Sequence, residues 1–426
     1  MHVRRARSDY YDGLLSKADV DRMLRAEGAV FPYGGKLNLL RYDAQGACRV
    51  DLNGPKGTLA TFDDVEAAWA SGATVQVMHA QQFHAPAWQL LASLERAFGS
   101  LFGANSYLTP AGQQGLAPHY DDVEVFLLQL EGSQDWRLHM PPASEEHPLP
   151  RDYSRDFKPS ELEELLLECR AERGDLVYLP RGTVFAGVAA GKPGAAGFSH
   201  HITASTYYRT AWFHFLEKAV SSALEQAAVT SPEFRAGLPV NFTDFMGTWH
   251  DCGEGTSAGA ANRRAAFGRS FRGLLRRLEE FVDLDATVDE MSVDFMAQRL
   301  PPCLAERKLE AASANAISLE TRLRWLDASA VRAMVNPDPE TSEPTVLLFH
   351  SRSNSRDKHM CVDTEAEEDV GCLRFDAAMF LPAIRVLCRS ADFVRCGDLP
   401  LKNEDDRVAL CQNLHTAGLL ELAASN

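Results

Sequence analysis

Apolar side chains recur at helical spacing in one segment of the N-terminal third. They are Trp88, Leu91, Leu94 and Phe98. Side chains three or four apart share one helix face, so this spacing predicts a helix over 85–98 that ends at Gly99.

Short segments dense in β-branched and aromatic residues follow, separated by turns. They span 121–130, 136–139, 175–180 and 198–207. Such strands predict a β-sandwich or barrel over about 100–210. The acidic stretch at 161–169, in contrast, predicts an amphipathic surface helix.

The pattern becomes helical from Trp212 onward. Helices are expected over 212–228, 262–283 and 286–300, with a Gly-, Ser- and Ala-rich loop over 252–261. A strand over 345–349, a helix over 376–389 and a last helix starting after Asn403 and ending at Gly418 complete the chain. Helices with a short β-ribbon at this size predict a winged-helix module.

Composition and charge narrow the class of protein. The 426 residues include 45% hydrophobic residues, which is enough for real cores in roughly two or three domains. The net charge of −16 argues against broad nucleic-acid binding, and no apolar run is long enough for a membrane span. Nine scattered cysteines without a CxxC pair argue against a zinc finger and indicate a reducing intracellular compartment.

The sharpest chemical signal is the run Pro118-His119-Tyr120-Asp121. Alternate side chains of a strand share a face, so His119 and Asp121 would point together into a barrel. An imidazole and a carboxylate supply two corners of the two-histidine, one-carboxylate triad that holds non-haem Fe(II). A hydrogen-bonded His–Asp pair at a strand end is the alternative explanation.

Longer segments around this motif resemble the JmjC-type ribosomal oxygenases. These are nucleolar protein-histidine hydroxylases of the 2-oxoglutarate/Fe(II) superfamily, and some are also described as histone lysine demethylases. The matching segments are NSYLTP at 105–110, GLAPHYDDVEVFLLQLEGSQDWR at 115–137, GDLVYLPRG at 174–182, STYYRTAW at 205–212, SADFV at 390–394, DDRVAL at 405–410 and AGLL at 417–420. The resemblance runs from about residue 20 to the end of the chain.

This resemblance implies an α+β chain of three parts. They are a double-stranded β-helix barrel with N-terminal elements over 1–211, a helical dimerisation region over 212–330 and a winged helix over 331–426. It also implies Fe(II) as metal, 2-oxoglutarate as cosubstrate, a ribosomal protein or histone as substrate, a homodimer, and a nuclear or nucleolar location.

Individual residues match the working positions of that family. His119 and Asp121 match the first two iron ligands. Tyr107 and Ser205 match hydroxyl groups that bind 2-oxoglutarate, and Asn105 lies in the same pocket strand. Trp136 matches an aromatic residue of the barrel, for which a purely core role is the simpler explanation.

Two positions depart from the family pattern. The turn Pro180-Arg181-Gly182 is followed by Phe185 where the resemblance implies the second histidine ligand, and a phenyl ring has no lone pair for iron. Gln134 stands where the family has a basic residue for the distal carboxylate of 2-oxoglutarate. An amide brings no charge, so cosubstrate binding should weaken. Arg137 should face away and is a poor substitute.

His201 is the candidate for a substitute third ligand. It lies four residues before Ser205 and should share its face, whereas His200 should face outward. A pocket or core histidine is the competing explanation for His201.

Three functions remain open. The first is an oxygenase that hydroxylates or demethylates a protein side chain with an unorthodox metal site. The second is an inactive pseudo-oxygenase that serves as a dimeric binding scaffold. The third is a nucleic-acid-associated scaffold that uses an arginine-rich helix, which the net charge disfavours. The arginines of that helix are Arg263, Arg264, Arg269, Arg272, Arg276 and Arg277.

Overall fold

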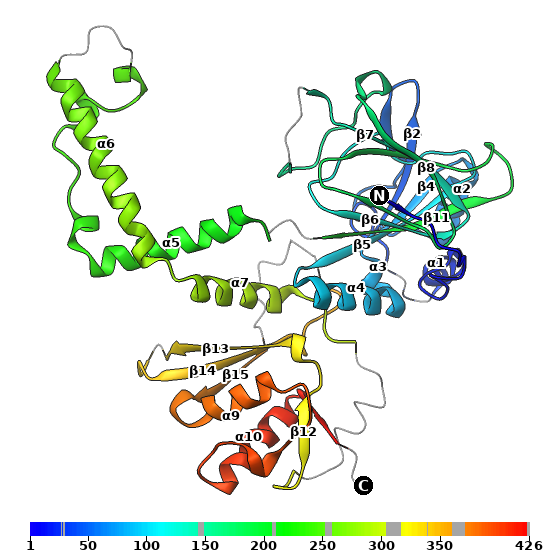
Figure 1. The fold of residues 1–426 in the computed structure, drawn as a ribbon. Helices are drawn as coiled ribbons and strands as arrows, with labels where there is room; N and C mark the ends of the chain where they lie inside the picture. Colours follow the sequence, from blue (N-terminus) through cyan, green and yellow to red (C-terminus); the bar gives the residue numbers. More distant parts are fainter. Residues whose placement is uncertain are drawn as a thin grey trace. The chain divides into compact units, whose positions relative to one another are not determined.

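The computed structural model describes residues 1–426 apart from 27, 29, 144–148, 207–209, 252–257, 304–316, 339, 360–370 and 424–426 (Figure 1). The chain separates into two units. One holds 1–208 together with 293–426, and the other holds 209–292.

Two sheets build the first part of the chain. The larger has eight strands, in the order β1 His2–Val3, β9 Leu176–Leu179, β6 Val125–Glu131, β11 Phe198–Thr206, β5 Phe102–Pro110, β4 Thr74–Val77, β2 Leu37–Asp43 and β3 Cys48–Asp51. The smaller has three strands, in the order β10 Val184–Ala189, β7 Ser133–His139 and β8 Leu165–Glu172. All strand pairs in both sheets are antiparallel.

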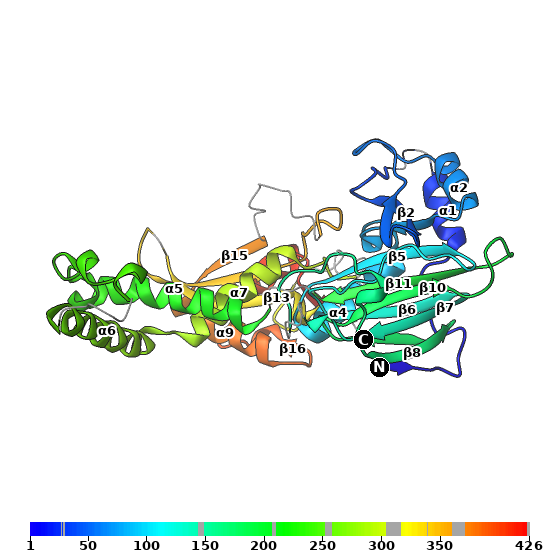
Figure 2. The same cartoon turned by 90° about the horizontal axis from the view of Figure 1, so that it is seen from above.

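Four helices accompany these sheets: α1 Lys17–Arg25, α2 Phe62–Ala70, α3 Ala80–Phe83 and α4 Ala85–Phe98. Capping boxes fix the starts of α1 and α2, because Ser16 and Thr61 each exchange hydrogen bonds with an aspartate three residues later. Helix α2 lies beside the β2–β4 end of the large sheet (Figure 2). The predicted helix over 85–98 is confirmed, and Gly99 ends it in the left-handed conformation at φ 63°.

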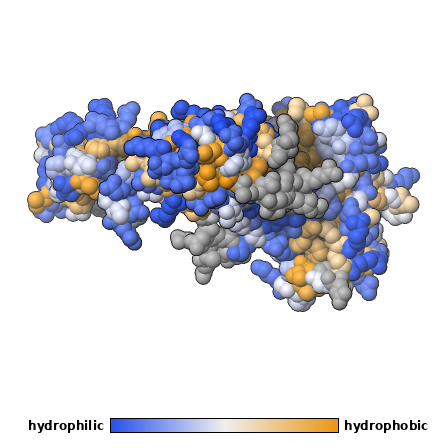
Figure 3. Space-filling view, turned by 90° about the horizontal axis from the view of Figure 1, so that it is seen from below, coloured by the Kyte–Doolittle hydropathy of each residue, from blue (hydrophilic) through white to orange (hydrophobic). Residues whose placement is uncertain are grey.

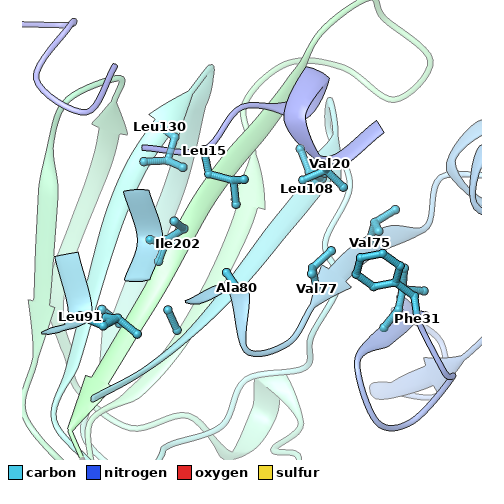
Figure 4. Close-up of a cluster of buried hydrophobic side chains, with 14 of the residues drawn as sticks. Leu15, Val20, Phe31, Val75, Val77, Ala80, Leu91, Leu108, Leu130 and Ile202 are labelled. Carbon is cyan, nitrogen blue, oxygen red and sulfur yellow. The ribbon is translucent and has the colours of Figure 1, made fainter. Parts of the chain in front are cut away.

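Strand alternation gives the large sheet two different apolar faces. On β6, Leu128 and Leu130 join a core with residues of the helices, including Val20 and Leu91 (Figure 4). Val125 and Leu127 of the same strand face the smaller sheet and pack with residues that include Trp136, Leu138 and Ala171. This second cluster, between the two sheets, lies in the interior of the predicted barrel.

The predicted strands are largely confirmed, with corrections. The strand expected over 121–130 begins only at Val125. The helix expected over 161–169 is wrong, because Leu165–Glu172 is strand β8 and pairs with β7 through Asp135–Arg170 and its neighbours. Strand β10 and the N-terminal strands β1–β4 were not anticipated by the sequence patterns.

The unit 209–292 is helical. It holds α5 Trp212–Thr230 and α6 Ala258–Leu278, and α7 Leu284–Gln298 begins in it. These helices confirm the three expected ones, while 252–257 of the expected loop lie outside the described residues. A small core of Ala223, Ala227 and Leu278 joins α5 to α6.

The C-terminal part has its own core under two three-stranded sheets. Its strands are β12 Arg322–Trp325, β13 Val331–Pro337, β14 Pro344–His350, β15 Gly371–Asp376, β16 Val394–Arg395 and β17 Leu420–Leu422, and its helices are α9 Ala377–Arg389 and α10 Glu404–Thr416. The strand at 345–349, the helix at 376–389 and the helix after Asn403 are confirmed. Among the described residues, no helix is both long and apolar enough to cross a bilayer.

Candidate functional site

A cavity of about 140 Å³ lies between the two sheets of the barrel. It brings together all the site residues expected from the sequence. They are Asn105, Tyr107, His119, Asp121, Gln134, Trp136, Phe185, His201 and Ser205. The alternation of β5, β7 and β11 explains this convergence, because the odd-numbered side chains of β5 and β11 and the even-numbered ones of β7 all face the cavity.

His119 is oriented by the chain just before it. Its Nδ1 lies 2.8 Å from the carbonyl oxygen of Ala117. A carbonyl can only accept, so the proton sits on Nδ1 and the lone pair on Nε2 stays free. Nε2 lies 3.9 Å from Oδ1 of Asp121. Two atoms that each lie about 2.1 Å from one ion are roughly 3–4 Å apart, so this pair suits two adjacent ligands.

Phe185 stands directly opposite His119. The backbone N–H of Phe185 donates to the His119 carbonyl at 2.9 Å, and the reverse bond is 3.3 Å long. The centroids of the His119 and Phe185 rings are 4.5 Å apart, and the centroids of the Phe185 and Trp136 rings are 6.1 Å apart. An apolar ring therefore occupies the position where the resemblance implies a third ligand.

His201 lies on β11 of the larger sheet, whereas Phe185 lies on β10 of the smaller one. Its ring stacks on Tyr107 with centroids 5.1 Å apart and meets Trp136 edge-on at the same distance. Burial lowers the pKa of His201 to about 3, so its ring is neutral. Among the described residues, no three His, Cys, Asp or Glu side chains are grouped to hold one metal ion. In this structure His201 does not join His119 and Asp121 in such a group.

His200 faces away from the cavity, as expected, but not toward solvent. It is fully buried, with Nδ1 2.9 Å from Glu131 and Nε2 2.8 Å from Ser106 Oγ. Glu131 also accepts from the backbone N–H of Lys17. His200 therefore ties the N-terminal segment to the outer face of the sheet.

The described cavity lining around Tyr107 is polar but includes no Lys or Arg. Gln76 donates to the Tyr107 hydroxyl at 2.8 Å, and burial raises the pKa of Tyr107 to about 12. The backbone N–H of His79 donates to Asn105 at 3.2 Å. Gln134 is 2% exposed, and no Lys or Arg is among the described residues that line the cavity. Arg137 points outward and pairs with Glu168, as the strand alternation predicted.

Burial raises the pKa of the Asp121 carboxyl, and the nearby His119 lowers it in part. A negative charge at Asp121 is therefore unfavourable unless a positive charge approaches it. A cation near His119 and Asp121 would stabilise the ionised Asp121 carboxylate, whereas a second anion in the cavity would repel it.

Comparisons with known proteins identify the family. A JmjC domain model matches residues 76–210. Ribosomal oxygenase 1 of Rattus norvegicus is 36% identical over 437 residues, which cover 98% of this chain and 68% of that protein. The human ribosomal oxygenase 1 is 35% identical, with 98% of this chain and 63% of that protein covered. The Dictyostelium discoideum protein named bifunctional lysine-specific demethylase and histidyl-hydroxylase NO66 is 31% identical over 99% of this chain and 77% of its own length.

This chain belongs to the JmjC ribosomal oxygenase family. It spans about two thirds of the length of its rat and human relatives. Among solved structures, Escherichia coli ycfD is similar with a TM-score of 0.49 at 15% identity, covering 99% of this chain and 94% of that one. A likeness of that size adds nothing to the assignment.

The residues present do not fit the complete cofactor set of a ribosomal oxygenase. The described residues offer iron two protein ligands, and the third place holds a phenyl ring. They offer the distal carboxylate of 2-oxoglutarate a neutral amide. The part of the site that suits the family's chemistry is the His119–Asp121 pair.

Sequence patterns missed Gly187 and Ala117. A Cβ at Gly187 would lie 2.5 Å from the Trp136 ring and 2.7 Å from Gln134 Nε2, so only glycine leaves room for both side chains. Gly187 is two residues after Phe185 on a strand, and that spacing could have placed it in the cavity. Ala117 acts through its backbone carbonyl, which no side-chain pattern reveals.

Proposed function

We propose that this protein uses its JmjC barrel to bind a polypeptide, a segment of a ribosomal protein or a histone, without iron-dependent turnover. The relatives' names, ribosomal oxygenase and lysine-specific demethylase and histidyl-hydroxylase, support a protein partner, and the family resemblance suggests the two classes. The observation that carries the absence of turnover is the Phe185 ring, 4.5 Å from the His119 ring at the third-ligand position.

The electrostatics of the cavity support this proposal. The 2-oxoglutarate dianion would enter a cavity whose described lining holds the Asp121 carboxyl and no cationic Lys or Arg. Burial of an unpaired charge is costly, and charge-assisted hydrogen bonds are roughly twice as strong as neutral ones. Without a third metal ligand and without a counter-charge for 2-oxoglutarate, the binding of iron and the binding of the cosubstrate are both weakened.

A working protein hydroxylase or demethylase is the second candidate. The free Nε2 of His119 beside Asp121 favours it, together with the Tyr107, Asn105 and Ser205 side chains in the cavity. His201 would have to leave its stack on Tyr107 to serve as the third ligand of Fe(II).

Turnover and binding distinguish the two candidates. The full chain is incubated with Fe(II), 2-oxoglutarate and either a histidine-containing ribosomal-protein peptide or a methyl-lysine histone peptide. We expect no peptide-dependent succinate and no change in peptide mass, while a peptide still binds in a fluorescence-anisotropy titration. Stoichiometric succinate with a hydroxylated or demethylated peptide would establish the oxygenase instead.

We also propose a homodimer formed through the helical region 212–330. Helix α5 exposes Trp212, Leu216, Val220 and Leu224, spaced four residues apart on one face, and the α6 residues Phe271 and Leu275 are more than half exposed. Figure 3 shows one face of the molecule, on which hydrophobic patches lie among hydrophilic side chains. Exposed apolar patches of several residues are typical of interfaces.

The remaining family properties are proposals of the same kind. We propose the three-part division at 1–211, 212–330 and 331–426, with a winged helix in the last part that binds protein or has a structural role. Helix α10 begins with Glu404, Asp405 and Asp406, which disfavours contact with nucleic-acid phosphates. We propose a nuclear or nucleolar location by resemblance to the family, and imaging of the tagged protein tests it.

A further inference from the structure

Three buried polar atoms on the cavity wall have no hydrogen-bond partner in the described part of the chain. They are Gln134 Oε1, Trp136 Nε1 and His201 Nδ1. The three residues are 2%, 4% and 5% exposed and all line the cavity. Other buried polar atoms of the described chain also lack partners, but these three belong to residues that line one cavity, where a single occupant can supply partners for all of them.

The chemistry of these atoms restricts the occupant. Gln134 and Trp136 lie two residues apart on β7 and therefore share its inner face. An indole N–H can only donate, so Trp136 needs an acceptor. The Gln134 amide has both an acceptor oxygen and a donor NH₂, and rotation of the amide exchanges their places. A full match to Gln134 therefore requires a group that also donates and accepts side by side.

A carboxylate fails this requirement. It only accepts, so it can match the NH₂ of Gln134 and must leave the oxygen unpaired. It also brings a charge that no Lys or Arg among the described lining residues balances, into a cavity that already holds Asp121. A carboxamide pairs with both the oxygen and the NH₂ of Gln134 through two reciprocal hydrogen bonds, and it brings no charge.

We propose that this cavity binds its ligand through an uncharged carboxamide group paired with Gln134, in place of the carboxylate that the family's cosubstrate carries. Gly187 leaves the space that the Gln134 amide occupies, since a Cβ there would lie 2.7 Å from Nε2. A cavity of about 140 Å³ is close to one that accepts a benzene-sized molecule, which suits a small amide or a Gln or Asn side chain of a bound polypeptide. The proposal deepens the binding function proposed above and rests on it.

Binding without metal tests this proposal separately from turnover. Isothermal titration compares 2-oxoglutaramate with 2-oxoglutarate, which differ only in an NH₂ for an oxygen at C5. A second pair, capped glutamine and capped glutamate, represents a polypeptide side chain. We expect the amide to bind at least about tenfold more tightly than the acid in one pair or both, and the pair that binds identifies the source of the group.

Variants assign the selectivity to Gln134. Gln134→Lys should reverse the preference toward the acid, and Gln134→Met, of similar volume, should abolish amide binding while the chain stays folded by circular dichroism. Gln45→Lys makes the same charge change at an exposed position and should leave the preference unchanged.

Equal or tighter binding of the acids would overturn the proposal, as would binding of neither amide, which leaves the cavity to water. Either result leaves the turnover measurement intact, because that measurement follows succinate and peptide mass. Peptide-dependent succinate would instead overturn the proposed function, whatever the amide titration gives.

Discussion

Introducing an imidazole at position 185 is the most direct test of the proposal that Phe185 leaves the metal site incomplete. Phe185 and His119 form a directly opposed pair with two backbone hydrogen bonds, and their ring centroids are 4.5 Å apart. In Phe185→His the new ring starts from the same backbone position and faces the same cavity. It would then lie beside the free Nε2 of His119 and the carboxylate of Asp121.

The size of the effect follows from the energy of one metal ligand. Four-ligand structural zinc sites bind with about 10–16 kcal/mol, or roughly 3 kcal/mol for each ligand, which corresponds to an affinity gain on the order of 100-fold. The same change removes a ring that is 7% exposed and packs on Trp136. The metal-free variant should therefore lose about 1–3 kcal/mol of unfolding free energy and recover stability when the metal is added.

Calorimetric titration with Co(II) or Mn(II) under nitrogen measures this gain. Phe98→His is the matched control, because Phe98 is 59% exposed and lies outside the cavity lining. It should leave metal affinity unchanged. Tight, stoichiometric metal binding by the wild type, or an unchanged affinity in Phe185→His, would refute the reasoning that Phe185 leaves the metal site without its third ligand.

Three further predictions follow from the same structure. Burial lowers the pKa of His201 to about 3, below the usual 6.5, so between these two values only the unfolded chain takes up the proton. The contribution of His201 to the free energy of unfolding is therefore full above about pH 6.5. It falls by up to about 1.4 kcal/mol per pH unit as the pH drops toward 3. Urea unfolding at several pH values should show a shallower acid loss in His201→Gln than in the wild type, and parallel curves would contradict this. Gly187→Ala should cost about 1–3 kcal/mol of unfolding free energy, because its Cβ would lie 2.5 Å from the Trp136 ring, whereas Ala186→Gly, its neighbour, should cost less than that. Leu216→Glu with Leu275→Glu should convert a dimer to a monomer in analytical ultracentrifugation, and a monomeric wild type would refute the proposed interface.

Local patterns in the sequence determined the elements whose shape depends on nearby residues. The apolar spacing of 85–98 and the left-handed glycine after it define α4 within the segment itself. The same holds for α9 and α10, whose starts carry Asp376 and Asn403. The resemblance together with strand alternation also predicted which side chains meet, since all nine expected site residues line one cavity.

Tertiary structure decided whatever depends on partners far along the chain. The stretch 161–169 has an apolar pattern that suits a helix, yet pairing with β7 makes Leu165–Glu172 a strand, because a neighbouring strand supplies the backbone hydrogen bonds that a helix would make internally. One hydrogen-bond partner of His200 is Glu131, which lies 69 residues earlier in the chain and also accepts from the backbone of Lys17. The stacking of His201 on Tyr107 likewise depends on the pairing of β11 with β5. The edge-on contact of His201 with Trp136 depends on the two sheets meeting across the cavity. Sequence periodicity fixes the face on which a side chain lies, whereas distances and hydrogen-bond partners are fixed only when remote strands pack together.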